Sequence, residues 1–574
     1  MTDYTFLQLR KASKKATEGT PDFKLVLMGD CATQHLATSI KGYGVLTGLN
    51  IDLLDIDYNL IDAQILDDYS ELYEKDPDFT LIFMCSEKLS IEFSECKDKS
   101  NFAETVYAKI SSYWERINSH IKTNILQFTF NENDDLVFGN YALKTSESFL
   151  FQVKKLNYLL ACGAQSNKNV FLIDLNRIQT NVGYCAFRDS KLYYAAKMPI
   201  TTELLPEVAK NVIDVIKATK GQFKKCVICD LDNTLWGGVI GDDGLSGIQI
   251  GELGVGQAYE DLQRWLKRLK ERGIILCICS KNNEDVAKEP FEKHPEMVLT
   301  LDDISVFVAN WDDKASNIMG IQKTLNIGMD SIVFLDDNPF ERNLVKSMIP
   351  EITVPELPED PSLYLDYLKS LNLFETASFS ETDKSRTEQY QSEMKRISLE
   401  KTYESYDDYL ISLEMLAEVQ PFDEFQTPRI AQLTQRSNQF NLRTVRCTEK
   451  DIADFAKNPE YITRYFMLKD KFGDHGLISV LLLKKLDSHT LFIENWLMSC
   501  RVLKRGMEEF IINSIVKIAK ENGFDTVVGE YIKTPKNAMV ADIYPKHGFE
   551  EIGDNRFKLN VNDYENEKTF INQK

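Results

Sequence analysis

One stretch, Cys226–Gly241, constrains the fold of this chain more than any other. It reads CVICDLDNTLWGGVIG, so apolar and thiol residues run into two aspartates and a glycine-rich turn follows. We interpret Cys226–Cys229 as a short buried strand with Asp230 and Asp232 at its carboxyl end. Because residues two apart in extended backbone point to the same side, both aspartates can face one spot.

Two carboxylates at one spot need a compensating charge. At ~4 Å and an effective dielectric of ~20 their repulsion is about 4 kcal/mol, which a proton or a cation must offset. Mg²⁺ prefers oxygen ligands and commonly takes carboxylates beside a substrate phosphate. The mouth of a parallel sheet suits both. The alternative interpretation is a solvated pair of aspartates in a strand-to-helix turn.

Three later stretches favour the cation site over the solvated turn. Two further apolar strands are predicted, GIILCIC and SIVFL, and each ends in polar residues. Between them WDDKAS places a lysine at an expected helix start. The polar residues in question are Ser280, Lys314 and the pair Asp336-Asp337.

The order nucleophile, hydroxyl, lysine and acidic pair resembles the four motifs of the haloacid dehalogenase superfamily of Mg²⁺-dependent phosphotransferases. The resemblance implies that Asp230 is the nucleophile of an aspartyl-phosphate and Asp232 the general acid and base. It implies that Ser280 binds phosphoryl oxygens and that Lys314 neutralises charge. It further implies Mg²⁺ held by Asp230, Asp232 (through its carbonyl), Asp336 and Asp337, and substrate contacts from Asn233, Thr234, Trp236 and Asn282.

A closer resemblance is to the FkbH-type subgroup, subfamily IIIC, of that superfamily. It rests on DLDNTLWGGV, SKN and DDNPFER, and on NQFNL and KFGDHG further along the chain. It implies dephosphorylation of a phosphoglyceryl donor, 1,3-bisphosphoglycerate, and loading of the glyceryl group on the phosphopantetheine arm of an acyl carrier protein. Two alternatives stay open: a plain Mg²⁺-dependent phosphatase of a small phosphomonoester, and a non-catalytic scaffold that binds an acyl carrier.

Length and charge bound the remaining choices. The chain has 574 residues and a net charge of −21, which at roughly 150 residues per domain suggests about two to four domains. An acidic balance argues against nucleic-acid and anionic-membrane partners, and an acidic carrier protein would need a local basic patch. The N-terminal stretch has no apolar signal region and no run of ~18 apolar residues occurs, so we expect a cytoplasmic enzyme without a membrane span.

The first predicted domain, residues 1–220, alternates strands and helices. Gly29-Asp30-Cys31 after the strand FKLVLMG resembles the opening block of SGNH-type esterases, with cysteine for serine. Cys31 is therefore a candidate nucleophile. The histidine base of those enzymes is missing, because no histidine stands between Phe171 and Pro206. We expect an SGNH-like or flavodoxin-like domain that is degenerate and serves docking or substrate positioning.

The expected fold class is α/β with three domains. Residues 221–375 form a Rossmann-like parallel sheet of haloacid dehalogenase type without a large cap. Residues 376–574 resemble the Gcn5-related N-acetyltransferase fold. That resemblance implies a coenzyme A or phosphopantetheine site in the loop of Arg501, Lys504, Arg505 and Gly506, and Tyr544 as the acid that protonates a thiolate. Lys504 departs from the pattern, because it stands where a glycine belongs.

Overall fold

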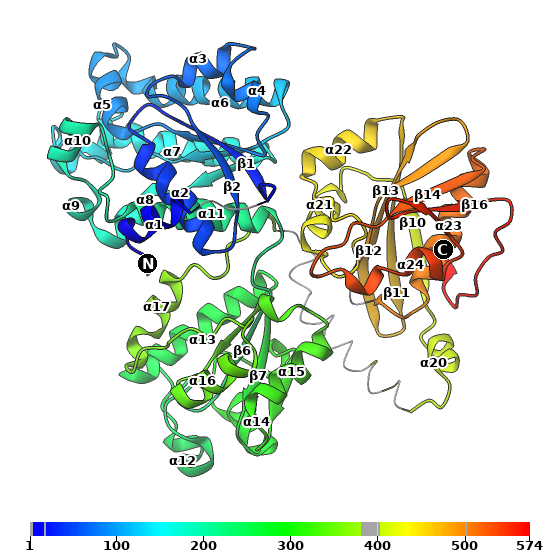
Figure 1. The fold of residues 1–574 in the computed structure, drawn as a ribbon. Coiled ribbons are helices and arrows are strands. Elements are labelled where there is room, and N and C mark those ends of the chain that lie inside the picture. The colour runs from blue at the N-terminus through cyan, green and yellow to red at the C-terminus, as the bar shows by residue number, and fades with distance from the viewer. Residues whose placement is uncertain (1–3, 16–18, 380–395, 397–398, 400–401, 500–501) are drawn as a thin grey trace. The chain divides into compact units, whose positions relative to one another are not determined.

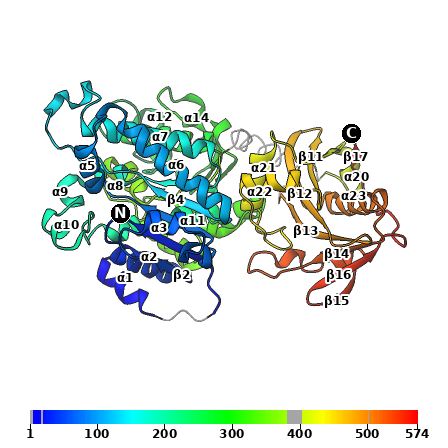
Figure 2. The same ribbon diagram turned by 90° about the horizontal axis from the view of Figure 1, so that it is seen from above.

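The computed structural model describes residues 4–15, 19–379, 396, 399, 402–499 and 502–574 (Figures 1 and 2). The chain divides into two compact units, Met1–Lys217 and Ala218–Lys574. Three sheets result, one in the first unit and two in the second. Among the described residues no helix is both long and apolar enough to cross a membrane.

The first unit is built on a five-stranded parallel sheet in the order β2-β1-β3-β4-β5. Its strands are buried on both faces, as in parallel sheets covered by helices. Alternation in β1 sends Leu25 and Leu27 into one core, with α1, α2, α8 and α11, and Val26 and Met28 into another, with α3 to α7. Figure 1 shows α6 and α7 along that second face. The strands are β1 Phe23–Gly29, β2 Ile51–Asp55, β3 Phe79–Phe83, β4 Asn124–Phe128 and β5 Val170–Ile173; the helices are α1 Phe6–Ser13, α2 Gln34–Leu46, α3 Ile61–Leu66, α4 Glu71–Lys75, α5 Ser86–Glu95, α6 Phe102–His120, α7 Phe149–Ser166, α8 Leu175–Val182, α9 Tyr184–Phe187, α10 Ser190–Ala196 and α11 Leu205–Thr219.

The second unit begins with a four-stranded parallel sheet in the order β8-β7-β6-β9. Val227 and Cys229 of β6 pack on one face with α13 and α14, and Cys226 and Ile228 on the other with α15 and α16. The segment after β6, which the structure describes throughout, carries only the short helix α12, so no large cap domain is inserted there. The elements are β6 Cys226–Cys229, α12 Ile240–Gly247, α13 Val255–Glu271, β7 Ile275–Ser280, α14 Glu284–Lys293, β8 Val306–Ala309, α15 Lys314–Leu325, β9 Ile332–Leu335, α16 Pro339–Met348 and α17 Tyr364–Ser370.

The rest of the second unit is an eight-stranded mixed sheet in the order β15-β16-β14-β13-β12-β11-β10-β17. The parallel strands β13 and β14 pair only from Thr490 to Phe492 and then diverge. Helix α23 packs its buried face on the core of this sheet. The elements are α20 Tyr406–Ser412, β10 Leu416–Gln420, α21 Thr427–Arg436, α22 Glu449–Lys457, β11 Tyr461–Asp470, β12 Gly473–Lys485, β13 Thr490–Met498, α23 Met507–Glu521, β14 Thr526–Glu530, α24 Ile543–Lys546, β15 Glu550–Gly553, β16 Arg556–Asn560 and β17 Asn572–Gln573.

Candidate active site

Asp230 and Asp336 meet because their strands are neighbours in register. Cys229 of β6 pairs with Leu335 of β9, so the next residue of each strand stands at the same edge of the sheet. Lys314, the first residue of α15, bridges the two carboxylates: its Nζ lies 2.8 Å from Asp230 Oδ2 and 2.6 Å from Asp336 Oδ2. The N-terminus of α15 is fixed by Asp313, whose side chain accepts from the N–H of Ser316 at 2.8 Å.

The electrostatics of this cluster show that it is short of positive charge. Burial and the charge of Asp230 raise the pKa of Asp336 to about 6, against the effect of Lys314. Burial and Asp230 also raise the pKa of Asp337. Burial alone would lower the pKa of Lys314, but the two carboxylates outweigh it and the pKa rises. One lysine faces three carboxylates, so a further cation would be stabilised here.

The carboxylates are arranged as a cation site requires. One oxygen from each of Asp230, Asp336 and Asp337 lies within 4.8 Å of the others. Asp230 Oδ1 is buried and has no hydrogen-bond partner, although a buried carboxylate oxygen without a partner is costly. A hard, oxygen-seeking ion such as Mg²⁺ fits this donor set.

Asp232 stands beside this cluster but its carboxylate is held elsewhere. Its Oδ1 accepts from the indole N–H of Trp236 at 2.9 Å and from the N–H of Ile240 at 3.0 Å. Its Oδ2 accepts from Asn282 Nδ2 at 2.8 Å. The side chain is absent from the group of three clustered carboxylates, which leaves its backbone carbonyl as the metal contact that the sequence predicts. Three hydrogen-bond donors fix the orientation of the carboxylate.

The predicted hydroxyl and amide lie where the sequence places them. Ser280 ends β7 and is 2% exposed, and its Oγ lies 3.2 Å from Asn282 Nδ2. Asn282 therefore connects Ser280 to Asp232. The neighbouring Lys281 pairs with Glu341 at 2.7 Å.

Of the predicted substrate contacts Asn233, Thr234 and Trp236, the structure leaves only Asn233 partly exposed. Trp236 and Thr234 are fully buried, so neither has a surface for a substrate to touch. Thr234 Oγ1 accepts from the N–H of Asp337 at 3.1 Å. Asn233 has a φ of 53° and its Oδ1 accepts from Gly238 N–H at 2.9 Å. All three shape the loop that carries Asp232.

Arg342 is a residue of the site that the sequence analysis did not single out. Its Nη1 donates to the carbonyl oxygens of Asp336 at 2.8 Å and Asp337 at 2.6 Å. The guanidinium thereby satisfies the backbone of the acidic pair. Its place in the DDNPFER motif was the available signal.

The loop before α23 keeps the backbone shape expected for a phosphate site, but a carboxylate of the protein lies beside it. Lys504 has a φ of 64°, the left-handed conformation that glycine adopts easily, and Gly506 has a φ of 77°. The N–H of Lys504 lies 3.3 Å from the carboxylate of Glu508, which is 9% exposed and whose pKa burial raises. This acid occupies the helix start where an anion would bind. Arg501 lies outside the described residues.

Arg505 is buried in an ion cluster instead of facing a ligand. Its guanidinium is 3.6 Å from Asp470 and 3.1 Å from Nε2 of His475, and all three side chains are 5% exposed or less. Arg396 also pairs with Asp470, at 2.6 Å. The guanidinium of Arg505 thus has protein side chains as partners, and its predicted place in a phosphopantetheine site stays a prediction.

Tyr544 is a core residue in this structure. Its ring is fully buried and stacks on Phe557, and a Cβ on Gly529 would come within 2.2 Å of it. Burial raises the pKa of its hydroxyl. The predicted role as the acid that protonates a thiolate is corrected, because no surface of Tyr544 reaches solvent.

The gap between β13 and β14 is filled by the segment of the NQFNL motif. The N–H of Met498 donates to the carbonyl of Phe440 at 3.1 Å, and that of Leu442 donates to Trp496 at 3.3 Å. On the other side Ile532 N–H donates to the carbonyl of Leu442 at 2.8 Å. Residues 440–442 thus act as an additional extended strand between the two.

Cys31 is 1% exposed and has no histidine among the groups that act on it, which are Cys85, Asp30 and Glu87. Burial raises the pKa of its thiol well above the usual range. A thiol held in the protonated form is a poor nucleophile, so these surroundings oppose the predicted role.

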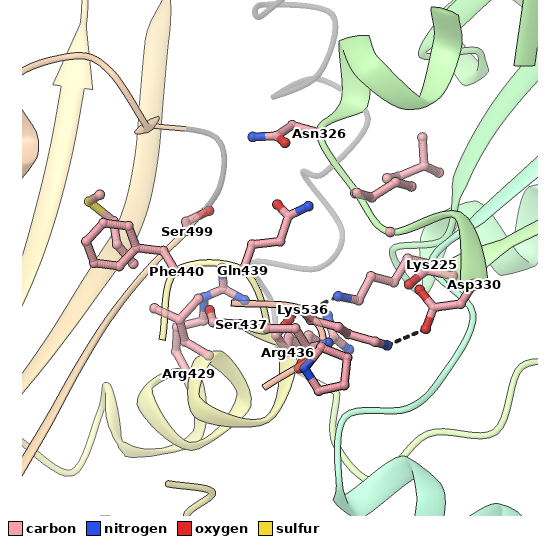
Figure 3. A pocket seen from close by; sticks show the side chains of 18 residues that line it. Lys225, Asn326, Asp330, Arg429, Arg436, Ser437, Gln439, Phe440, Ser499 and Lys536 are labelled. Carbon is pink, nitrogen blue, oxygen red and sulfur yellow. Dashed lines mark hydrogen bonds and ion pairs between the residues drawn. The ribbon is translucent and has the colours of Figure 1, made fainter. Parts of the chain in front are cut away.

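The second unit also contains a pocket of about 340 Å³, remote from the carboxylates (Figure 3). It is lined from the amino ends of β6, β7 and β9, whereas the carboxylates stand at the carboxyl ends. Lys225 Nζ donates to the carbonyl of Arg436 at 2.9 Å, and Lys536 pairs with Asp330. Together with Arg429 these residues make the lining basic.

The carboxylate-and-lysine site described above is typical of haloacid dehalogenase-like phosphatase domains. Comparisons with known proteins agree with this class. A family described as "FkbH, N-terminal domain" matches residues 24–217. The crystal structure of the N-terminal part of the protein BF1531 from Bacteroides fragilis, containing a phosphatase domain and complexed with Mg, is 48% identical. The match covers 66% of this chain and 100% of that chain, with a TM-score of 0.63. This chain belongs to the FkbH family.

The C-terminal quarter has weaker similarities, which concern fold alone. The ribosomal-protein-S18-alanine N-acetyltransferase from Escherichia coli is 14% identical, covers 25% of this chain and 94% of that chain, and has a TM-score of 0.21. The spermidine/spermine N-acetyltransferase SpeG from Vibrio cholerae, in mutant form, is 12% identical, covers 26% and 95%, and has a TM-score of 0.21. No curated protein matches the chain.

Proposed function

We propose that this protein is a Mg²⁺-dependent phosphotransferase that works through a phosphorylated Asp230. The observation that carries the proposal is the buried, unpartnered Oδ1 of Asp230, in contact range of Asp336, Asp337 and Lys314. The Mg²⁺ reported for the Bacteroides fragilis relative supports the choice of cation. Bound at the three carboxylates, Mg²⁺ would neutralise phosphoryl oxygens and the nucleophile.

The chain's own residues divide the chemistry into two displacements. Asp230 forms a bond to phosphorus while the bond from phosphorus to the leaving oxygen breaks, and Asp232 supplies a proton to that oxygen. Water then attacks the aspartyl-phosphate and Asp232 takes its proton, which releases phosphate and regenerates Asp230. Lys314 and Ser280 stabilise the charge on the transferring group.

We infer that the substrate is a phosphorylated three-carbon acid and that the acyl group passes to an acyl carrier protein. In this scheme Asp230 removes the phosphate ester of the substrate, while the carrier thiolate attacks the acyl carbon and displaces the acyl phosphate as inorganic phosphate. The FkbH family supports the substrate, and the short α12 supports an open site suited to a pendant arm. The basic residues around the pocket of Figure 3 supply the local positive surface that an acidic carrier would need.

The experiment combines phosphate release with mass spectrometry of a carrier. We expect the wild-type protein with Mg²⁺ to release phosphate from 1,3-bisphosphoglycerate and a co-incubated carrier to gain the glyceryl mass. Asp230→Asn should lower phosphate release by roughly four orders of magnitude or more, because the nucleophile is lost. The matched control Asp242→Asn, at an exposed carboxylate on α12, should retain it.

The outcomes separate the candidate functions. Phosphate release without a change in carrier mass would leave a phosphatase of a small phosphomonoester. Carrier binding unchanged in Asp230→Asn, together with no phosphate release from any acyl phosphate or phosphomonoester tested, would leave a scaffold. Wild-type rates in Asp230→Asn would end the proposal.

A further inference from the structure

The first unit has a second cluster of chemically active side chains, at the point where its strand order reverses. In the order β2-β1-β3-β4-β5 the chain moves outward from β1 to β2 and then returns to place β3 on the other side of β1. The carboxyl ends of β1 and β3 therefore flank the crevice in which open α/β sheets bind their ligands. Gly29 of β1 is level with Phe83 of β3.

Two thiols and a carboxylate stand at this crevice. Asp30 and Cys31 follow β1, and Cys85 follows β3 and precedes α5. One oxygen of Asp30 and both sulfurs lie within 4.8 Å of one another. The exposures of Asp30, Cys31 and Cys85 are 8%, 1% and 2%. Asp30 Oδ1 accepts from the N–H of Cys85 at 2.9 Å, which fixes the carboxylate against the second strand.

This arrangement is costly without a ligand. Asp30 is a buried carboxylate beside two buried sulfurs. Taking the carboxylate out of water costs free energy, and a cation bound by this carboxylate and the two sulfurs offsets that cost. Soft thiolate ligands select Zn²⁺ over the hard Mg²⁺.

A neighbouring carboxylate is an independent sign of a ligand. Glu87, in the first turn of α5, is 6% exposed, and Arg188 Nε donates to its Oε1 at 2.8 Å. Its second oxygen, Oε2, is buried and has no hydrogen-bond partner. Glu87 stands two residues after Cys85, in the helix that begins at Ser86. An unpartnered acceptor at this depth fits a hydrogen-bond donor, such as a water on a metal.

We propose that Asp30, Cys31 and Cys85 bind a Zn²⁺ ion, with one coordination position left for water. This site is separate from the proposed phosphotransfer site in the second unit. Zn–S bonds of about 2.3 Å and Zn–O bonds of about 2.0–2.2 Å bring ligand atoms to about 4 Å apart or less, so the ligands need to contract by about 1 Å or less. Binding converts both thiols to thiolates and releases two protons; with the Asp30 carboxylate the three ligands carry three negative charges, so the occupied site has a net charge of −1.

The test uses the reduced full-length protein in saturating Mg²⁺, which fills the carboxylates of the second unit. We expect one Zn²⁺ per chain, with two protons released as measured by calorimetry in buffers of different ionisation enthalpy. Co²⁺ in place of Zn²⁺ should produce the thiolate-to-cobalt absorption in the near ultraviolet, which carboxylate sites do not give.

Matched cysteine variants assign the ligands. Cys31→Ser and Cys85→Ser should each weaken Zn²⁺ binding by roughly 100-fold and abolish the cobalt absorption. Cys162→Ser, at an exposed thiol on α7, should change neither. All three should keep the phosphate release of the wild type, so a failure here is distinct from a failure of the proposed function.

Two results would overturn the zinc site. One is equal Zn²⁺ binding by the wild type and by a Cys31→Ser/Cys85→Ser double variant. The other is a thiol count showing Cys31 and Cys85 joined as a disulfide in the protein as purified. If the serine variants fail to fold, the wild type decides the question, because absence of the cobalt absorption excludes thiolate ligands.

Discussion

Lys314 Nζ and Asp336 Oδ2 form a 2.6 Å ion pair in which the lysine side chain is 4% exposed and the aspartate is fully buried. A second carboxylate, Asp230, shares the same ammonium group. The lysine therefore holds the side chains of Asp230 and Asp336 together. Each carboxylate becomes an unpaired buried charge when Lys314 is removed.

Lys314→Met should separate cation binding from catalysis. We expect Mg²⁺ to bind more tightly, because the carboxylates lose their competing positive charge, while kcat falls by roughly 100-fold or more as phosphoryl charge goes unneutralised. Calorimetry with Mg²⁺ and phosphate release measure the two effects. Lys323→Met, at an exposed position of the same helix, is the control. Weaker Mg²⁺ binding in Lys314→Met would contradict this electrostatic account.

Trp236→Phe should show that Trp236 positions Asp232. The substitution removes one of three donors to the carboxylate and keeps the buried ring, so kcat should fall about 10-fold with KM nearly unchanged. The free energy of unfolding should fall by roughly 2–3 kcal/mol, because the smaller ring leaves a cavity in addition to the lost hydrogen bond. Trp311→Phe, at a 69% exposed indole that also donates a hydrogen bond, is the control. A rise in KM with kcat unchanged would instead indicate a substrate contact.

His475 should make the second unit less stable in acid. Burial, Arg505 and Arg396 lower the pKa of His475 to about 4, although Asp470 acts to raise it. The folded pKa lies below the unfolded value of about 6.5, so the unfolded chain takes up a proton first as pH falls. About 3 kcal/mol of the free energy of unfolding should be lost between pH ~6.5 and ~4. Denaturant unfolding should show this slope reduced in His475→Gln and kept in the exposed His489→Gln.

Tyr544→Phe should stabilise the second unit or leave it unchanged. The Tyr544 hydroxyl is buried without a hydrogen-bond partner of good geometry, and removing such a group gains about 1 kcal/mol. Thermal unfolding and the carrier-loading assay measure the result. A loss of loading with unchanged stability would restore a chemical role for this tyrosine.

The residues of the carboxylate-and-lysine site could be predicted because strand ends are visible in sequence. Apolar runs mark β6, β7 and β9, and parallel strands bring Asp230, Ser280 and Asp336 to one edge. The pairing of side chains was not visible. That Trp236 and Asn282 bind Asp232 depends on rotamers in a folded loop, which no spacing encodes.

Long-range packing explains the remaining differences. Tyr544 looks like a turn residue in sequence, but Gly529 on β14 leaves the space that its ring fills. The proximity of Cys31 and Cys85 depends on strand order, because residues so far apart in sequence meet only when β3 lies next to β1. The left-handed backbone of Lys504 could be predicted more easily, because this residue stands at a position where the family pattern has glycine.

The segment Phe440–Leu442 prevents an extended peptide from pairing with β13. Asn537 Nδ2 donates to the carbonyl of Asn441 at 2.9 Å, and Asn441 is fully buried. A peptide that binds by adding a strand to β13 would first have to displace these three residues and break their hydrogen bonds. The space between β13 and β14 is therefore closed to such a peptide by the protein's own backbone.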